Sequence, residues 1–358
     1  MNISFFITTL GGGGAERVLT NLANYLVEKG HSIEIVVLRS GQIKYEIDSR
    51  VNIIFLDDGS RCRKLLKHLH EVRQSREYLL SKNENDCVIS FLELPMLLSL
   101  AFKKKMRCKL IVSERSNPLY YSKLYRFFLY HLINRADGAV FQTEKSKSWY
   151  KNYYGEYAVI PNAINEKFMI ANASSLKGNR IVSVGRIDNN KNHLLLIDSF
   201  MEICSRFPTY KLEIYGKGPL ESKLSRYVEL NGLSDRILFK GFCHDIISEL
   251  ADASIFVLTS EYEGMPNSLM EAMALGIPSI STDCFGNDGE YRLIDSRENA
   301  IIVPQNDKEA LAKAISELIT DKYFSMKLAK KAIEVRNTFS PSKIYEMWGN
   351  FIKRICLK

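Results

Sequence analysis

The sequence predicts an α/β protein made of two doubly wound, Rossmann-like domains that face a central cleft. Its 358 residues exceed what one hydrophobic core usually organises. Short apolar runs alternate with segments of helical spacing, which indicates parallel sheets covered by helices on both faces. The alternation starts again after the polar segment 165–179. Ligands are therefore expected where the carboxyl ends of both sheets meet one cleft.

Seven apolar runs in the first half are rich in Val, Ile and Phe and predict strands. A segment of helical spacing, Glu16–Lys29, follows the first of them. The predicted strands are Ile3–Thr8, Ser32–Leu38, Val51–Leu56, Cys87–Phe91, Lys109–Ser113, Gly138–Gln142 and Tyr157–Ile160. They define a first domain over residues 1–164.

Six further strand-like runs predict a second domain over residues 165–340, joined to the first near Pro161 and Asn162. These runs are Arg180–Val184, Lys211–Tyr215, Ile237–Lys240, Ser254–Leu258, Ser279–Ser281 and Ala300–Val303. The closing residues 341–358 are amphipathic. They are expected to form a helix that packs back toward the first domain.

Composition limits where the protein works and what it meets. The seven scattered cysteines contain no CxxC pair, which predicts a reduced, cytoplasmic protein without a metal. No uncharged apolar stretch is long enough to span a bilayer, so any membrane contact is expected to be peripheral. Residues 1–170 hold 25 Lys and Arg against 17 Asp and Glu, so they carry the whole net charge of +8. This excess indicates an anionic partner, although a solvated basic face would produce the same count.

A run of four glycines, Gly11 to Gly14, follows the first predicted strand and opens a helix. Glycines let a ligand approach the backbone, while the free amides of the helix start attract anionic or polyhydroxy groups. The spacing differs from the dinucleotide fingerprint, and no acidic residue follows the second strand to bind a ribose. A tight strand-to-helix turn explains the loop equally well.

The second domain carries charged residues at a strand end. Arg186 and Lys191 follow its first strand, where a leaving diphosphate could lie, although surface charge would explain either cation alone. Glu263 stands on a loop, and Glu271 lies about two turns into the next helix, because eight residues span roughly 12 Å. One carboxylate can meet sugar hydroxyls and the other a ribose, with the helix-start amides placed for phosphates.

Five motifs occur in one order over nearly the whole chain. They are Gly-Gly-Gly-Ala-Glu-Arg near the start, Pro161-Asn162-Ala163, Val184-Gly185-Arg186 with Lys191, Gly216-Lys217-Gly218-Pro219, and Glu263-x7-Glu271. In these motifs the chain resembles the GT-B retaining glycosyltransferases of family 4. The resemblance implies the GT-B fold and transfer of a sugar from a nucleotide-diphosphate donor.

The resemblance also implies residue roles. Arg186 and Lys191 match the pair that neutralises the donor diphosphate. Glu263 matches the acid facing the donor sugar hydroxyls, and Glu271 the acid binding the ribose diol. The donor-binding set is Gly14, Arg186, Lys191, Gly216, Gly264, Met265, Pro266, Asn267, Ser268 and Glu271. The set expected for the acceptor or lipid diphosphate is Gly12, Gly13, Glu16, Arg17, Arg63, Lys64 and Lys67.

Arg115, in Ser-Glu-Arg-Ser-Asn, departs from the family pattern, because many relatives have a histidine there, beside the donor sugar. Arginine cannot act as a base at neutral pH, but it can donate hydrogen bonds to a hydroxyl or phosphate. Arg115 therefore joins Glu263, Arg186 and Lys191 in the predicted catalytic set, as a contact and not a proton acceptor.

The sequence contains no Asp-x-Asp, so the ligand set of metal-clamped diphosphate chemistry is missing. Cationic side chains and helix amides are expected to act instead, without metal or cofactor. The resemblance implies retention by same-face attack, with a donor phosphate oxygen accepting the acceptor proton. By family frequency, the expected donor is UDP with a hexose or N-acetylhexosamine.

The basic first half points to the acceptor. Cations decorate a predicted helix from Arg61 to Arg76. The chain is similar to transferases that extend polyprenyl-diphosphate-linked saccharides for bacterial O-antigen, capsule or N-glycans, where a basic helix meets the lipid diphosphate. A second cluster, 103–109, precedes aromatics in 120–130, a composition that suits an anionic membrane at the inner face of the bacterial plasma membrane. Core packing would explain the aromatics equally well.

Other functions stay open. A nucleotide-sugar 2-epimerase shares the two-domain fold, and a glycosyltransferase could use a soluble acceptor. Nucleic-acid binding would use the positive charge, but no compact recognition motif accompanies it, so no nucleic-acid partner is expected. The glycine spacing disfavours an NAD-dependent oxidoreductase.

Overall fold

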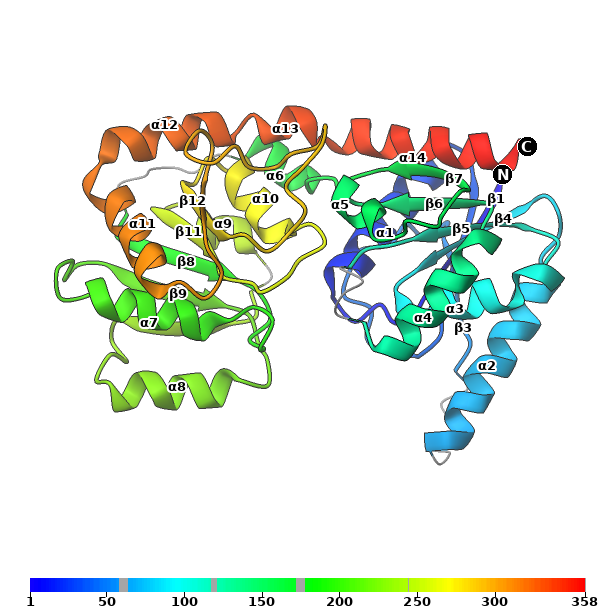
Figure 1. Ribbon diagram of the computed structural model, residues 1–358, viewed down its shortest axis with the longest axis horizontal. Coiled ribbons are helices and arrows are strands. Elements are labelled where there is room, and N and C mark those ends of the chain that lie inside the picture. Colours follow the sequence, from blue (N-terminus) through cyan, green and yellow to red (C-terminus); the bar gives the residue numbers. More distant parts are fainter. Residues whose placement is uncertain (58–63, 117–120, 172–177, 244, 358) are drawn as a thin grey trace. The chain divides into compact units, whose positions relative to one another are not determined.

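The computed structural model describes residues 1–57, 64–116, 121–171, 178–243 and 245–357, with only the backbone of 64–67. The chain divides into two compact units (Figure 1). The N-terminal unit comprises Met1–Ala163 and Ser342–Lys358, and the C-terminal unit comprises Ile164–Pro341. Each unit is built on one parallel sheet, so the predicted α/β class with two Rossmann-like domains is confirmed.

The N-terminal sheet has seven parallel strands in the order β3-β2-β1-β4-β5-β6-β7. β1 pairs with both β2 and β4, so the strand order reverses between β1 and β4, which is where doubly wound folds place ligands. The strands are β1 (Asn2–Ile7), β2 (Ser32–Val37), β3 (Asn52–Phe55), β4 (Asp86–Phe91), β5 (Lys109–Ser113), β6 (Gly138–Phe141) and β7 (Glu156–Val159).

Helices cover both faces of this sheet because adjacent strand residues point to opposite sides. Phe5 packs toward α1 (Gly14–Glu28) and α14 (Pro341–Cys356). Phe6 packs on the other face with α2 (Lys64–Ser81), α3 (Glu93–Phe102) and α4 (Lys123–Leu132). Figure 1 shows these three helices together on one side of the sheet. Shorter elements are η1 (Lys103–Lys105), η3 (Ile133–Arg135) and α5 (Glu144–Ser148).

The terminal helix α14 belongs to the N-terminal unit although it follows the C-terminal unit in sequence. Trp348 is fully buried and stacks near Phe91, with ring centroids 6.0 Å apart. A Cβ at Gly138 would lie 2.9 Å from Ile355 Cδ1, so this glycine lets the helix lie directly on β6. None of the helices in the described part of the chain has the length and apolarity needed to cross a bilayer.

The C-terminal sheet has six parallel strands in the order β10-β9-β8-β11-β12-β13. They are β8 (Arg180–Val184), β9 (Lys211–Tyr215), β10 (Ile237–Gly241), β11 (Ile255–Leu258), β12 (Ser279–Thr282) and β13 (Ile301–Val303). One face packs against α7 (His193–Ile203), α8 (Glu221–Leu230) and α11 (Lys308–Thr320). The other packs against α6 (Glu166–Ile170), α9 (Ile246–Leu250), α10 (Asn267–Ala274) and α13 (Val335–Thr338), and α12 (Lys322–Ala332) contributes to both cores.

Candidate functional site

The loops that follow β8 and β9 lie in direct backbone contact at the carboxyl edge of the C-terminal sheet. The Ile187 amide donates to the Lys217 carbonyl over 3.1 Å, and the Gly185 amide donates to Tyr215 over 2.9 Å. Gly216 has φ +136°, and a Cβ there would lie 1.9 Å from the Gly185 carbonyl oxygen. No other residue fits so close an approach without moving the backbone. The predicted glycine motif therefore holds the two loops together.

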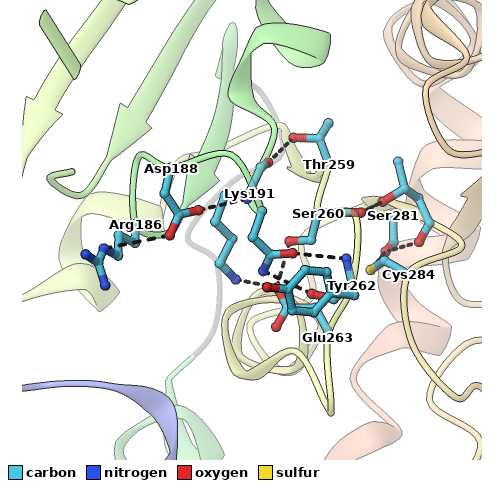
Figure 2. Close-up of polar contacts among 11 residues, drawn as sticks. Arg186, Asp188, Lys191, Thr259, Ser260, Tyr262, Glu263, Ser281 and Cys284 are labelled. Carbon is cyan, nitrogen blue, oxygen red and sulfur yellow. Dashed lines mark hydrogen bonds and ion pairs between the residues drawn. The ribbon is translucent and has the colours of Figure 1, made fainter. Parts of the chain in front are cut away.

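Lys191 and Glu263 form an ion pair at this edge (Figure 2). Lys191 Nζ lies 2.5 Å from Glu263 Oε1, and the Ser260 hydroxyl donates to the same oxygen over 2.7 Å. The two side chains are only 20% and 15% exposed. Burial lowers the pKa of the Lys191 ammonium, but the charge of Glu263 and the hydrogen bond to it outweigh burial and raise the pKa. Lys191 is therefore a fixed cation at neutral pH.

Asn190 joins the Lys191 loop to the Glu263 loop. Its carbonyl accepts from the Glu261 amide over 2.7 Å, and its side chain bonds both backbone groups of Tyr262 at 3.1 and 3.2 Å. The Lys191 carbonyl accepts from the Thr259 hydroxyl over 2.9 Å. The backbone of both loops is thus fixed, and the charged pair is preorganised. Asn190, Thr259 and Ser260 were absent from the predicted site, although Asn190 stands beside Lys191 in the sequence.

Arg186 is less constrained than Lys191. Its side chain is 72% exposed, and its Nε lies 3.7 Å from Asp188 Oδ2, a distance typical of a loose surface pair. Asp188 is itself held by the Lys191 amide over 3.0 Å. The structure therefore does not bring Arg186 into the Lys191–Glu263 contact, and its guanidinium can turn toward a ligand at the loop.

The segment from Gly264 to Ser268 leads into α10, and Glu271 in this helix is the last residue of the predicted donor set. Met265 and Pro266 are buried, so the Met265 side chain belongs to the core and only its backbone could meet a donor. Gly264, Asn267 and Ser268 are half-buried at the start of the helix. Glu271 is 6% exposed on the second turn. A carboxylate so deeply buried is expensive unless it is paired, which is typical of a functional position.

The N-terminal glycine loop, Gly11–Gly14, begins α1, with Gly13 at the N-cap. Glu16 folds back over this helix start, because a Cβ on Gly13 would lie 2.2 Å from Glu16 Oε2, and the Thr9 hydroxyl donates to Glu16 over 3.2 Å. Arg17 is half-buried on the first turn. Gly12 has φ +106°, so its conformation favours glycine. The loop is both a helix start and a close-packed turn.

Two residues that sequence reasoning missed cover this loop. The Tyr45 hydroxyl donates to the Gly13 carbonyl over 2.9 Å, and Lys44 Cδ lies 2.8 Å from where a Cβ of Gly12 would be. Both come from the irregular segment after β2, which has no periodic pattern to mark it. Lys44 adds an exposed cation beside the amides of the helix start.

Arg115 lies inside the N-terminal unit, only 8% exposed. Its guanidinium lies over the rings of Phe91 and Trp348, at 5.5 and 5.1 Å from their centroids. Nε donates to the Ser113 hydroxyl over 2.8 Å, and Nη1 to the Ile160 carbonyl over 3.3 Å. Burial lowers the pKa of the Arg115 guanidinium. Nη2 alone makes no hydrogen bond within the described residues, so at most one nitrogen remains for the predicted substrate contact.

The predicted acceptor cations are only partly described. Arg63 lies outside the described residues, while Lys64 and Lys67 lie in the first turns of α2. This helix is fixed to the end of β2 by Glu71, whose carboxylate accepts two hydrogen bonds from Arg39, at 2.7 and 3.2 Å. No group of three or more His, Cys, Asp or Glu is arranged to hold a metal ion among the residues that the structure describes.

Comparison with known families decides the identity of the two units. Residues 12–168 match the model of Glycosyltransferase Family 4, and residues 165–335 match the model of Glycosyl transferases group 1. The chain is a family 4 glycosyltransferase. This confirms the enzyme class inferred from the five motifs.

A curated relative and two solved structures are similar to this chain over nearly its whole length. The chain is 27% identical to a Campylobacter jejuni α-1,4-N-acetyl-D-galactosaminyltransferase named for a GalNAc-GalNAc-diNAcBac saccharide on undecaprenol diphosphate, covering 99% of both chains. A sucrose-phosphate synthase of Thermosynechococcus elongatus superposes with a TM-score of 0.84 at 18% identity, covering 99% of this chain and 98% of that one. Anabaena HepE in complex with UDP-glucose superposes with a TM-score of 0.82 at 17% identity, covering 99% and 100%. These structures establish the GT-B fold.

Proposed function

We propose that this family 4 glycosyltransferase moves a hexose or N-acetylhexosamine from a UDP-sugar to a polyprenyl-diphosphate-linked saccharide, with retention of configuration and without a metal. The observation that carries the proposal is the Lys191–Glu263 ion pair, 2.5 Å long, fixed at the carboxyl edge of the C-terminal sheet just before α10. In this proposal Lys191 is the cation that meets the leaving diphosphate, and Glu263 beside it is the carboxylate that meets the sugar.

In the donor half, the departing UDP gains charge as the glycosidic bond breaks, so cations and helix amides there stabilise the transition state more than the ground state. Lys191 is charged and preorganised for this, and the exposed Arg186 can close from the other side of the loop. Glu263 accepts hydrogen bonds from sugar hydroxyls, and Glu271 from the ribose. A phosphate oxygen of the donor takes the acceptor proton, so no protein nucleophile is needed.

In the acceptor half, two observations support a lipid-linked saccharide. The Campylobacter jejuni relative covers 99% of this chain and is named for such an acceptor. The excess of positive charge lies entirely in residues 1–170, which suits a diphosphate held at an anionic membrane. Gly12, Gly13 and the α1 start would meet the acceptor, and the cations at the start of α2 would meet its diphosphate. The enzyme would then work at the inner face of the bacterial plasma membrane.

The test combines donor binding with transfer. A panel of nucleotide sugars is screened by thermal shift, since a ligand at about 100 times its Kd adds roughly 2.7 kcal/mol to the free energy of unfolding. The stabilising donor is then incubated with a polyprenyl-diphosphate-linked saccharide, and the anomeric configuration of the product is read by NMR. We expect the sugar to be transferred with retention of its anomeric configuration.

Two outcomes would replace this function by an alternative. Conversion of the donor sugar to its 2-epimer without any acceptor would identify an epimerase of the same fold. Transfer to a free oligosaccharide at an unchanged kcat/KM, with no gain from the lipid diphosphate, would identify a soluble acceptor.

A further inference from the structure

Helix α4 carries an apolar stripe that faces solvent. Leu124, Phe127 and Phe128 are spaced three and four residues apart, so they share one face of the helix. They are 68%, 55% and 42% exposed, and Phe127 and Phe128 contact each other edge-to-face with centroids 5.6 Å apart. We call these three residues the α4 stripe. A group of large apolar side chains on one exposed helix face marks an interaction surface, unlike single exposed residues.

Other residues hold α4 against the N-terminal unit, so the α4 stripe is not needed for this packing. Leu129 is buried, and the Tyr125 hydroxyl donates to the Glu93 carbonyl over 2.5 Å. Tyr121, just before the helix, is 6% exposed. The sequence left open whether these aromatics pack in the core or face a membrane, and the described residues do both. Tyr121 and Tyr125 pack into the unit, while Phe127 and Phe128 stay exposed.

Cations flank the α4 stripe at both ends. Lys123 and Arg126 stand on its first turns. The segment that follows α3 adds Lys104, Lys105 and Arg107, all exposed. Arg135, just beyond the other end of α4, donates to the Leu100 and Ala101 carbonyls over 3.3 Å, which places that basic segment beside the helix end.

Basic residues outnumber acidic ones in this part of the sequence. Residues 103–126 contain eight Lys and Arg, of which Arg115 is buried, against one acidic residue, Glu114. Glu93, whose carbonyl accepts from Tyr125, is an exposed acidic residue near the start of α4. Glu114 is buried and accepts a hydrogen bond from the Tyr121 hydroxyl over 2.5 Å, so it adds no exposed negative charge. An exposed apolar row with cations on its flanks is complementary to a surface with anionic headgroups above an apolar layer.

We propose that the α4 stripe inserts into the headgroup region of an anionic phospholipid bilayer and seats the N-terminal unit on it. This inference rests on the proposed function, because it explains how the acceptor is delivered. The contact between Tyr125 and Glu93 places the start of α4 at the carboxyl edge of the sheet, since α3 and α4 follow β4 and β5 there. The acceptor loop Gly11–Gly14 opens at that same edge, after β1. A lipid-linked saccharide can then reach the loop while its polyprenyl chain stays in the bilayer.

The experiment is vesicle flotation of the full chain with vesicles of phosphatidylcholine alone or with phosphatidylglycerol added. The variant Leu124→Ser/Phe127→Ser/Phe128→Ser should reduce partitioning onto phosphatidylglycerol vesicles about a hundredfold, because membrane affinity scales with the apolar area inserted. The matched control changes three exposed apolar residues of the C-terminal unit, Leu230, Tyr323 and Met326, to serine. The control should bind like the wild type.

A second readout is independent of how well the triple variant folds. In Phe128→Trp, brominated phospholipids should quench the new indole on vesicle binding, whereas in Tyr323→Trp they should not. Wild-type partitioning of the triple variant, or an unquenched indole in Phe128→Trp on bound vesicles, would overturn the proposal. A third result would also overturn it: the wild type is a dimer in sedimentation, and the triple variant is a monomer that still binds vesicles. In that case a second copy of the chain would cover the stripe.

Donor binding separates this inference from the proposed function. The triple variant should retain wild-type UDP-sugar affinity in calorimetry, since every change lies in the N-terminal unit. Normal donor binding with unchanged vesicle binding refutes the α4 stripe alone. If the triple variant loses vesicle binding but the wild type binds no nucleotide sugar, the proposed function is refuted while the membrane role of the α4 stripe is supported.

Discussion

Replacing Lys191 by methionine tests the donor site most directly. Methionine keeps an apolar stem of similar length beside Gly185, where Lys191 Cε lies 3.1 Å from the position that a Cβ would take, and it removes the ammonium group. Loss of a desolvated charge contact to the diphosphate weakens binding by about 2 to 5 kcal/mol. At 1.4 kcal/mol per tenfold, the Kd for UDP should rise roughly 30- to 4,000-fold.

The same change also affects folding, and the two effects can be separated. Among the described residues, the Glu263 carboxylate would keep only the Ser260 hydroxyl as a partner, at 2.7 Å. A carboxylate that is largely buried and loses its cation destabilises the fold by about 3 kcal/mol. Lys191→Met/Glu263→Gln removes that charge. The double variant should therefore recover most of the stability but none of the UDP affinity.

Calorimetry with UDP and denaturant unfolding provide the two measurements. The control is Lys331→Met, which removes an exposed lysine whose Nζ lies 2.6 Å from Glu334 on the same unit. It should change neither quantity by more than about 0.5 kcal/mol. Wild-type UDP affinity in a folded Lys191→Met protein would show that this lysine does not meet the diphosphate.

Three further expectations concern metal, acceptor and pH. Turnover should survive EDTA, and activity lost to EDTA but restored by magnesium would refute a metal-free mechanism. Neutralising Arg63, Lys64 and Lys67 together should weaken liposome binding roughly a hundredfold, at about 1 kcal/mol each, and raise the KM for lipid-linked acceptor without changing donor affinity. Burial, and then the charge of Lys191, lowers the pKa of His193 from 6.5 to about 4. The folded state therefore holds it neutral, and about 3 kcal/mol of stability, complete above pH 6.5, is lost as the pH falls through 4. When the unfolding free energy of His193→Gln is measured by denaturant titration at several pH values, it should lack this pH-dependent loss. A dependence on pH equal to that of the wild type would contradict the expectation.

Strand periodicity predicted most of the architecture because buried parallel strands are near-continuous apolar runs. The helix α6 was not predicted, because Glu166–Ile170 is a five-residue helix within a segment interpreted as polar. Its signal was Asn165, whose side chain caps the helix by accepting from the Lys167 amide over 3.0 Å. Short helices depend on such single caps and lack a periodic pattern.

The sequence predicted donor roles for Lys191 and Glu263, which stay predictions, but it did not predict that the two side chains contact each other. Lys191 and Glu263 lie 72 positions apart and were assigned to different parts of a donor. They meet because β8 pairs with β11, which brings the loops after these two strands together at one edge. Strand order is a property of the whole sheet, so no local pattern at either residue encodes it.

Arg115 shows the limit of transferring a role by position. Its motif gives no sign of burial, because Trp348, one of the rings against its guanidinium, comes from the last helix of the chain. The same guanidinium binds the Ile160 carbonyl, where the chain is about to leave the N-terminal unit. Arg115 therefore ties together the segments by which the chain leaves and re-enters this unit, whatever its single remaining donor meets.

Under the proposed function, the Lys191–Glu263 ion pair would also affect which ligands bind. Without ligand, Lys191 and Glu263 neutralise each other, so a diphosphate that draws the ammonium away leaves a half-buried carboxylate with fewer donors. UDP alone offers that carboxylate no replacement, whereas a UDP-sugar brings hydroxyl donors to it. An unsatisfied acceptor that is largely buried is costly, so at the proposed donor site the pair would make diphosphate binding tighter when a sugar is present. The same arrangement would favour release of UDP after transfer, because Glu263 would again pair with Lys191.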